Sequence, residues 1–270
     1  MHEPLQHRAQ RVLQRSYHAL MHVTQSERIR DDAIEQFRGR FTTLEGTPAR
    51  VHAWSPLVAD LVVELSAAFA ALRILQNEVW GLAAAAAGAT SFPPSVHDAC
   101  NKLRASTAKG TKRATWITPI PPEVRKLFTA YWAQDGERLA NYRNVDQHFD
   151  VLARQCFLDC AASDFSRLWV YLPDNPENKS PKEFTYNCGT DGITFARKSF
   201  DELYALIDSI SRQHVNEDAP LSRTIQFHPP IVHELGVRRT TALLLLDHDG
   251  REALRVGHAE DQTVSISRLP

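Results

Sequence analysis

Residues 141–150, NYRNVDQHFD, bring together an arginine, an amide, a carboxylate and a histidine within a few positions. If the segment is helical, Asn144 and His148 are four residues apart and lie only about 40° apart around the helix axis. Arg143 lies about 140° from His148 on an ideal helix, so its long side chain has to curl towards the same groove from the flank. Asp146 follows Arg143 by three residues and can form a local ion pair with it. The segment is therefore a candidate site.

These types of side chain suit chemistry on a phosphodiester. A histidine titrates near neutral pH and can act as a general acid or base. An arginine stays charged and can bind two phosphate oxygens at once, which stabilises charge in a transition state. An asparagine can orient either the histidine or the phosphate. The alternative interpretation is a solvated helix face whose local pairs contribute only about a few tenths of a kcal/mol each.

The arginine and the histidine, with four residues between them, resemble the motif of the HEPN superfamily of helical-bundle proteins. In that family a polar residue, often asparagine, follows the arginine, and Asn144 matches it. The resemblance covers residues 55–165. It implies a metal-independent endoribonuclease that needs no cofactor, since RNA supplies its own nucleophile, the 2′-hydroxyl. Arg143 would hold phosphate, His148 would transfer protons and Asn144 would orient them.

The same resemblance implies partners. Many members of the family are bacterial toxins or antiviral defence components that act as homodimers, with two copies of the motif facing each other. RNA, a second copy of the chain and an antitoxin or other partner protein are the expected partners. A non-enzymatic interaction or scaffold protein, whose helical bundle dimerises or docks a partner, remains the alternative function.

The densest basic run of the chain is a second candidate for RNA binding. It consists of five cations, Lys102, Arg104, Lys109, Lys112 and Arg113. The chain has 31 Lys and Arg against 32 Asp and Glu, so binding to nucleic acid requires such a local patch. Trp116 beside the run can stack on a base or pack inside the fold. The alternative for the run is an exposed helix end followed by a loop.

Composition and motifs exclude several other classes of protein. With 43% hydrophobic and 23% charged residues, the chain has the composition of a globular protein. The four cysteines form no C-x-x-C pair, which predicts reduced, mostly buried thiols, with disulfides or zinc ligands as the alternative. H-E-x-x-H, G-x-x-x-x-G-K and G-x-S-x-G are absent, so we expect no metal site and no nucleotide loop. The sequence DHDG at 247–250 predicts a hairpin turn rather than a calcium loop.

Targeting and membrane segments are also not expected. The polar N-terminus has no signal-peptide core. The most apolar run, residues 82–89, is too short to cross a bilayer. The sequence therefore predicts a cytoplasmic protein with no membrane association.

The elements that must position these residues are mostly helices. Apolar periodicity predicts a helix over 5–23, and Ser26 is expected to cap a second helix that stops near Gly46 and Pro48. A long buried helix follows, with Ser55 as its cap and Gly88 past its end. A shorter helix comes after Pro94. From 122 to 163 the pattern is again helical, with a kink or break at Gly136. These elements predict an antiparallel helical bundle over residues 1–165.

The pattern changes after residue 163. Residues 167–173 and 184–187 are predicted to be short strands, and 196–214 an amphipathic helix. Residues 240–256 predict a β-hairpin, and 262–267 a third strand. The chain is thus expected to be mainly α, with an antiparallel bundle and a smaller C-terminal α+β tail over 166–270, although the boundary near 165 is soft.

Overall fold

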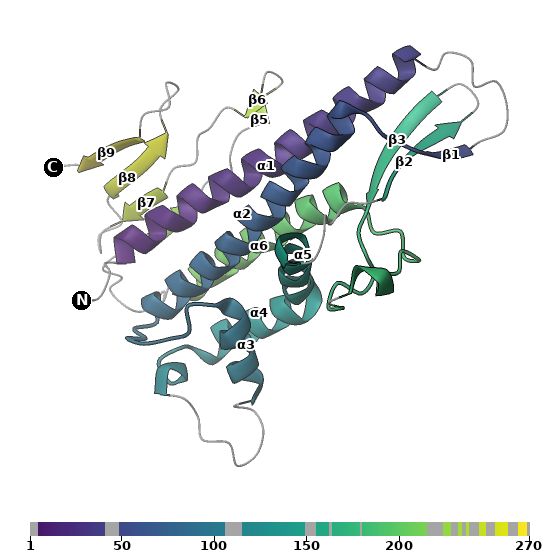
Figure 1. The fold of residues 1–270 in the computed structure, drawn as a ribbon. Coiled ribbons are helices and arrows are strands. Elements are labelled where there is room, and N and C mark those ends of the chain that lie inside the picture. Colours follow the sequence, from purple (N-terminus) through teal and green to yellow (C-terminus); the bar gives the residue numbers. More distant parts are fainter. Residues whose placement is uncertain are drawn as a thin grey trace. The chain divides into compact units, whose positions relative to one another are not determined.

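The fold is that of a computed structural model, drawn in Figure 1. The residues that it describes are 5–40, 49–105, 115–148, 155–161, 164–178, 180–214 and six strands between 224 and 268. Helices dominate these residues, and small antiparallel sheets complete them, which confirms the predicted mainly α class. No helix among the described residues combines the length and the apolar character that crossing a bilayer requires.

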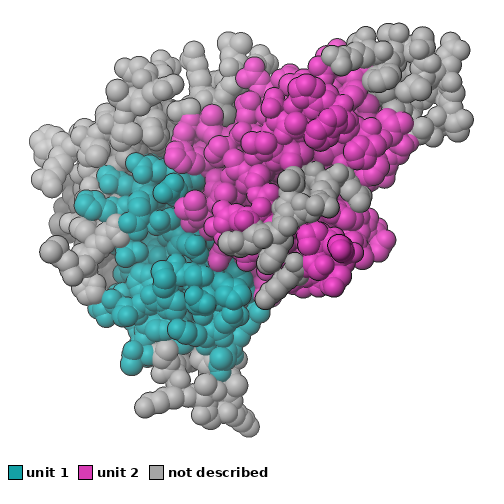
Figure 2. Space-filling model, viewed as in Figure 1, with its two compact units in different colours: residues 1–16, 76–132, 203–270 teal, residues 17–75, 133–202 magenta. Residues whose placement is uncertain are grey.

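The chain divides into two compact units whose sequences interleave (Figure 2). Unit 1 comprises residues 1–16, 76–132 and 203–270, and unit 2 comprises residues 17–75 and 133–202. Three long helices contribute residues to both units: α1 (Leu5–Arg40), α2 (Pro56–Ala86) and α6 (Gly192–His214). The predicted boundary near residue 165 falls inside strand β3 (Asp164–Tyr171), and the division at that point stays a prediction.

Helix α1 is one continuous helix, so the prediction of two helices separated at Ser26 was wrong. The Ser26 side chain is fully buried, and its hydroxyl donates to the His22 carbonyl at 2.9 Å instead of capping a new helix. A serine can bond back to the preceding turn in this way without ending a helix, and neither Gly nor Pro occurs between Leu5 and Arg38. The buried stripe accordingly continues through Ala33, Ile34 and Phe37.

Helix α2 begins and ends where its sequence predicts. The hydroxyl of Ser55 accepts a hydrogen bond from the Val58 amide at 3.2 Å and caps the first turn. At the other end Gly88 has a φ of 80°, a conformation that costs glycine little. The amide of Gly88 bonds to the Ala85 carbonyl and that of Ala89 to the Ala84 carbonyl, which is the Schellman pattern.

In unit 1 the shorter helices α3 (Val96–Ala105) and α4 (Pro122–Tyr131) contact each other through Cys100 and Phe128, and Phe128 packs on Trp80 of α2. The Trp80 indole donates to the Pro93 carbonyl at 2.8 Å. Its ring meets those of three neighbours edge-on at centroid distances of 5.1 to 6.3 Å: Phe92, Trp116 and Phe128. Unit 1 therefore has an aromatic core of its own, and Trp116 packs in the fold.

Gly136 marks an irregular turn, as predicted. Residues Trp132–Gly136 form a π-helical turn between α4 and α5 (Glu137–His148). The prediction that the helical pattern continues to residue 163 was wrong, because α5 ends at His148 and residues Gln155–Ala161 form strand β2. Alternate residues of β2, Cys156 and Leu158, are buried, which is the period of a strand rather than of a helix.

Unit 2 contains α5, the N-terminal part of α6 and a three-stranded antiparallel sheet in the order β1-β2-β3, with β1 at Ala49–His52. The inner face of the sheet packs on α2 and α6: the space around Gly192 is bounded by the Leu65 side chain and the Val170 carbonyl. A Cβ at residue 192 would lie 2.7 Å from Leu65 Cδ2, so only glycine fits there. The strand predicted at 184–187 is not formed; a 3-10 turn, Pro181–Glu183, precedes an irregular segment.

The C-terminal residues form strands, as predicted. The predicted hairpin corresponds to β7 (Leu243–Leu246) and β8 (Glu252–His258), which pair antiparallel, and the third strand to β9 (Val264–Arg268). These three strands and β4 (Thr224–Phe227) form a sheet in the order β4-β7-β8-β9. Two short strands, β5 (Val232–His233) and β6 (Gly236–Val237), pair separately. The DHDG turn lies outside the described residues.

Candidate functional site

The predicted site residues lie at the C-terminal end of α5. The Arg143 guanidinium donates from Nη1 to the Asn144 amide oxygen at 3.3 Å. Arg143 is half-buried and Asn144 is exposed. His148 is the last residue of the helix, one turn beyond Asn144, so the two positions share one side of α5. The side chain of His148 lies outside the described residues, so the convergence of the three side chains stays a prediction.

Helix α5 is held from its buried side. The Tyr142 ring is fully buried between Phe69 of α2 and Phe195 of α6, and its hydroxyl donates to the Pro173 carbonyl at 2.9 Å. Burial raises the pKa of Tyr142 far above its ordinary value, so the phenol stays a donor. Asp146, predicted to pair with Arg143, accepts a short hydrogen bond from the Ser66 hydroxyl of α2. These contacts hold the buried side of α5 in place, and Arg143 and Asn144 lie on its outward side.

The basic run is described only in part. Lys102 and Arg104 are exposed in the last turn of α3, in unit 1. Lys109, Lys112 and Arg113 lie outside the described residues. The interpretation of this run as a phosphate-binding patch stays a prediction.

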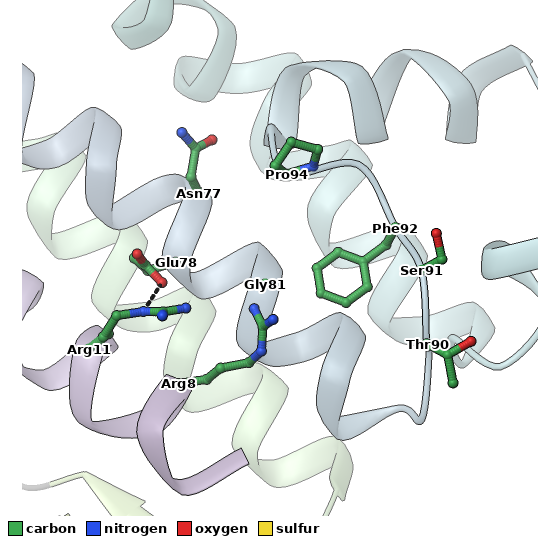
Figure 3. Close-up of a pocket in the computed structure, with 9 residues that line it drawn as sticks. All are labelled: Arg8, Arg11, Asn77, Glu78, Gly81, Thr90, Ser91, Phe92 and Pro94. Atoms are coloured by element: carbon green, nitrogen blue, oxygen red, sulfur yellow. Dashed lines mark hydrogen bonds and ion pairs between the residues drawn. The ribbon is translucent and has the colours of Figure 1, made fainter. Parts of the chain in front are cut away.

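Unit 1 also contains a hollow of about 360 Å³ between the start of α1, the end of α2 and the segment that follows α2 (Figure 3). Arg11 donates to the Glu78 carboxylate at 3.0 Å, and the Arg8 guanidinium lies 5.3 Å from the centre of the Phe92 ring. Gly81 leaves room for Arg8, because a Cβ there would lie 3.1 Å from Nη1. Arg11 is thus paired with a carboxylate, and Arg8 lies over a ring.

Unit 2 contains a second hollow, of about 320 Å³, that the sequence did not predict. Three cations from three elements line it: Arg138 of α5, Arg167 of β3 and Lys198 of α6. Arg138 donates to the Thr190 hydroxyl at 3.2 Å, but its buried Nε has no hydrogen-bond partner among the described residues. An unsatisfied guanidinium N–H beside a hollow is a donor that an anionic ligand can use.

Two carboxylates of this hollow are occupied by protein donors. Asp191 caps α6 and accepts from the amides of Val170 and Thr194 and from the Thr194 hydroxyl. Asp135 pairs with Lys198, which holds the pKa of the Lys198 ammonium above its usual value. The one sequence signal for this region was the alternation Arg-x-Trp-x-Tyr in 167–171, which places the three side chains on one face of a strand.

Three of the cysteines are free thiols, as predicted. Cys100 and Cys156 are buried, and Cys188 is exposed. Burial raises the pKa of the Cys156 thiol to about 11. No group of three metal-ligating side chains occurs in the part of the chain that the structure describes.

Comparison of the chain with protein-family models, with curated proteins and with solved structures gives no match in any of the three.

Proposed function

We propose that the chain is an HEPN-like, metal-independent endoribonuclease of a bacterial toxin or defence system, acting through Arg143, Asn144 and His148. The observation that carries this proposal is the outward-facing Arg143–Asn144 pair on a helix whose last residue is His148. Arg143 forms no ion pair with any described carboxylate, so its charge is available to a phosphate. A half-buried arginine whose only hydrogen bond among the described residues is to a neutral amide is suited to an anionic ligand.

The proposed reaction uses the nucleophile that RNA carries. His148 accepts the proton of a 2′-hydroxyl, whose oxygen forms a bond to the adjacent phosphorus. The bond from phosphorus to the 5′-oxygen breaks, and that oxygen takes up a proton from water, which leaves a 2′,3′-cyclic phosphate and a 5′-hydroxyl. Arg143 stabilises the charge on the phosphate oxygens. Asn144 holds the Arg143 guanidinium and orients it.

The proposal includes a homodimer in which two copies of the α5 cluster share one cleft. A symmetric dimer brings two copies of a small set of catalytic groups together in one composite site. If each cleft takes its arginine from one copy and its histidine from the other, then mixing Arg143→Ala and His148→Ala chains restores part of the cleavage rate. Independent sites leave the mixture inactive.

The decisive experiment measures cleavage of a labelled single-stranded RNA by the full chain in the presence of a chelator. His148→Ala is expected to reduce the rate by about 10²- to 10⁴-fold, the usual contribution of general acid–base catalysis. His18→Ala is the matched control, because His18 is exposed on α1 in the same unit and has no proposed role. Equal rates for His148→Ala and the parent, with both folds intact, would rule out this site.

A second candidate function is a non-enzymatic interaction protein. Two large apolar side chains in unit 2 favour it, Trp54 at 73% exposure and Val63 at 70% exposure. Exposed apolar side chains of this size are typical of surfaces that bind partners. Under this alternative Trp54→Ala weakens partner capture or self-association while RNA is not cleaved at all.

A further inference from the structure

The outer face of the β1-β2-β3 sheet, in unit 2, carries two rows of side chains that no part of the α5 cluster uses. Strand register aligns Arg50, Asp159 and Arg167 in one row across the three strands. The next row aligns three rings, His52, Phe157 and Trp169. Tyr171 follows Trp169 on the same face of β3. We call these seven residues the aromatic face.

The aromatic face is open except at the buried Tyr171, whereas the opposite face of β2 and β3 is core. Cys156, Leu158, Leu168 and Val170 on the opposite face are all at most 3% exposed. On the aromatic face Arg50, His52 and Arg167 are exposed, and Phe157 and Trp169 are half-buried. A folded sheet normally turns rings inwards and charges outwards, so a face that exposes both together is unusual for a purely structural surface.

The rings of this face are held in place by one another. His52 lies edge-on to Phe157 at a centroid distance of 5.4 Å, and Phe157 and Trp169 each lie within 5.8 Å of Tyr171. The Trp169 indole donates to Asp159. Rings fixed on a sheet lose little conformational entropy when a flat ligand stacks on them, which favours binding.

The cations of the face are positioned by the rings and by one carboxylate. Asp159 accepts two hydrogen bonds from Arg50, at 2.6 and 3.2 Å, and Arg50 Nη1 also donates to the Tyr171 hydroxyl. Arg167 lies over Trp169, with its guanidinium carbon 3.5 Å from the ring centre. Arg167 forms no hydrogen bond or ion pair with any described residue, so it offers a full set of donors beside a stacking ring.

The aromatic face runs directly into the hollow of unit 2, because Arg167 and Trp169 line both. The hollow adds the unsatisfied Arg138 Nε, the Thr190 hydroxyl and Lys198. A row of stacking rings bordered by a cationic hollow matches a ligand that alternates flat bases with phosphates. Single-stranded nucleic acid has this structure, while a duplex hides its base faces.

We propose that the aromatic face and the hollow of unit 2 together bind a single strand of RNA, with bases on His52, on Phe157 and on the Arg167–Trp169 stack, and a phosphate in the hollow. This inference rests on the proposed function for the identity of the nucleic acid and says where the strand binds. Arg167 contacts both the strand's phosphate and the Trp169 ring. The binding surface is therefore separate from the α5 residues proposed to react.

The test measures binding of a labelled 12-nucleotide RNA to the full chain by fluorescence anisotropy, in the His148→Ala background so that the strand stays intact. Trp169→Ala is expected to weaken binding about tenfold or more, because a base–ring stack contributes that much. Trp169→Phe keeps a ring and restores most of the affinity. Arg167→Ala lowers the slope of log K against log salt by about 0.7, the value for one phosphate contact on a single strand.

Matched controls distinguish binding at this surface from non-specific attraction of RNA to positive charge. Lys126→Ala removes an exposed cation of unit 1 that pairs with Glu123, and it is expected to leave affinity unchanged. A hairpin duplex of the same length should bind more weakly than the single strand. If a mononucleotide binds as tightly as the strand, the site is a small-molecule pocket rather than an extended surface, and the inference is overturned.

The two proposals fail in different ways. If the parent binds the strand through Trp169 but cleaves no RNA, the endoribonuclease proposal fails and this inference stands. If the parent cleaves RNA while Trp169→Ala and Arg167→Ala, both folded by circular dichroism, leave KM and affinity unchanged, this inference fails alone. If Trp169→Ala does not fold, Arg167→Ala decides the matter, because Arg167 is exposed and makes no bond that the fold needs.

Discussion

The end of α5 and the aromatic face are both in unit 2, yet they are built in opposite ways. The α5 cluster draws its polar side chains from a few positions of one helix, Arg143, Asn144 and His148. The aromatic face draws on three strands, and Arg50 and Asp159, which pair across it, are 109 residues apart. Proton transfer needs a few converging groups, while binding a strand needs area. The difference suggests that reaction and binding can be altered separately.

The largest expected effect concerns Tyr142, which supports both regions. Its ring packs behind α5, and its hydroxyl bonds to the Pro173 carbonyl, two residues past the end of β3. Tyr142→Ala is expected to lower the free energy of unfolding by about 3–5 kcal/mol, the cost of removing a buried ring, and to abolish binding and cleavage together. Urea unfolding followed by tryptophan fluorescence measures the change.

Tyr142→Phe is the control for that variant. It removes only the hydrogen bond and should cost about 1 kcal/mol, with both activities retained. If Tyr142→Phe destabilises as strongly as Tyr142→Ala, the bond to Pro173 rather than ring packing connects the two regions. If neither variant affects binding, the two regions do not share this support.

Helices with clear ends were predictable from the sequence, because their signals are local. Ser55 and Gly88 define the ends of α2 through hydrogen bonds within a few residues. Ser26 misled the prediction, since a serine can either cap a helix or bond back within one. Local signals thus predict that a helix forms, but not always how far it continues along the chain.

The segment after α5 shows the limit of periodicity. Residues 155–161 are apolar enough for a helix, but Cys156 and Leu158 alternate with a half-buried Phe157, as in a strand. A short apolar run is compatible with the periodicity of a helix or of a strand. Here the pairing of residues 155–161 with β1 and β3 makes the segment a strand. The same pairing creates the aromatic face, so no motif along the chain could have predicted it. The hollow depends in addition on Arg138 and Lys198 from two helices.

A smaller effect is expected for Asp159, the one carboxylate of the aromatic face. The Arg50 guanidinium holds the pKa of Asp159 below its usual range, and the Trp169 indole acts in the same direction. A depressed pKa in the folded state means that the ionised carboxylate stabilises the fold at pH above about 4, and that this contribution is lost as pH falls below that value. Because the pair is partly exposed, the loss in Asp159→Asn should be roughly 1 kcal/mol at neutral pH.

The same variant should act on binding in the other direction. Asp159→Asn removes a negative charge from the aromatic face and releases Arg50, so the affinity for RNA is expected to rise by about two- to fivefold while stability falls. Glu123→Gln, a neutralised and exposed carboxylate in unit 1, should change neither quantity. Weaker RNA binding by Asp159→Asn would mean that the carboxylate orders Arg50 for the ligand. Stability curves of parent and variant that stay equally far apart from neutral pH down through the depressed pKa of Asp159 would contradict the role of the ion pair.

The smallest effect distinguishes the hollow from α5 without any substitution. Cys188 is exposed and precedes Gly189, which lines the hollow, whereas Cys156 is buried on the inner face of the sheet. The Asp174 carboxylate raises the pKa of the Cys188 thiol, so a maleimide should react slowly at pH 7 and faster as pH rises past the usual thiol range. Bound RNA should slow this labelling several-fold if the strand enters the hollow, and mass spectrometry of the labelled peptides assigns the site. Labelling of Cys188 at the same rate with and without saturating RNA would place the strand away from the hollow.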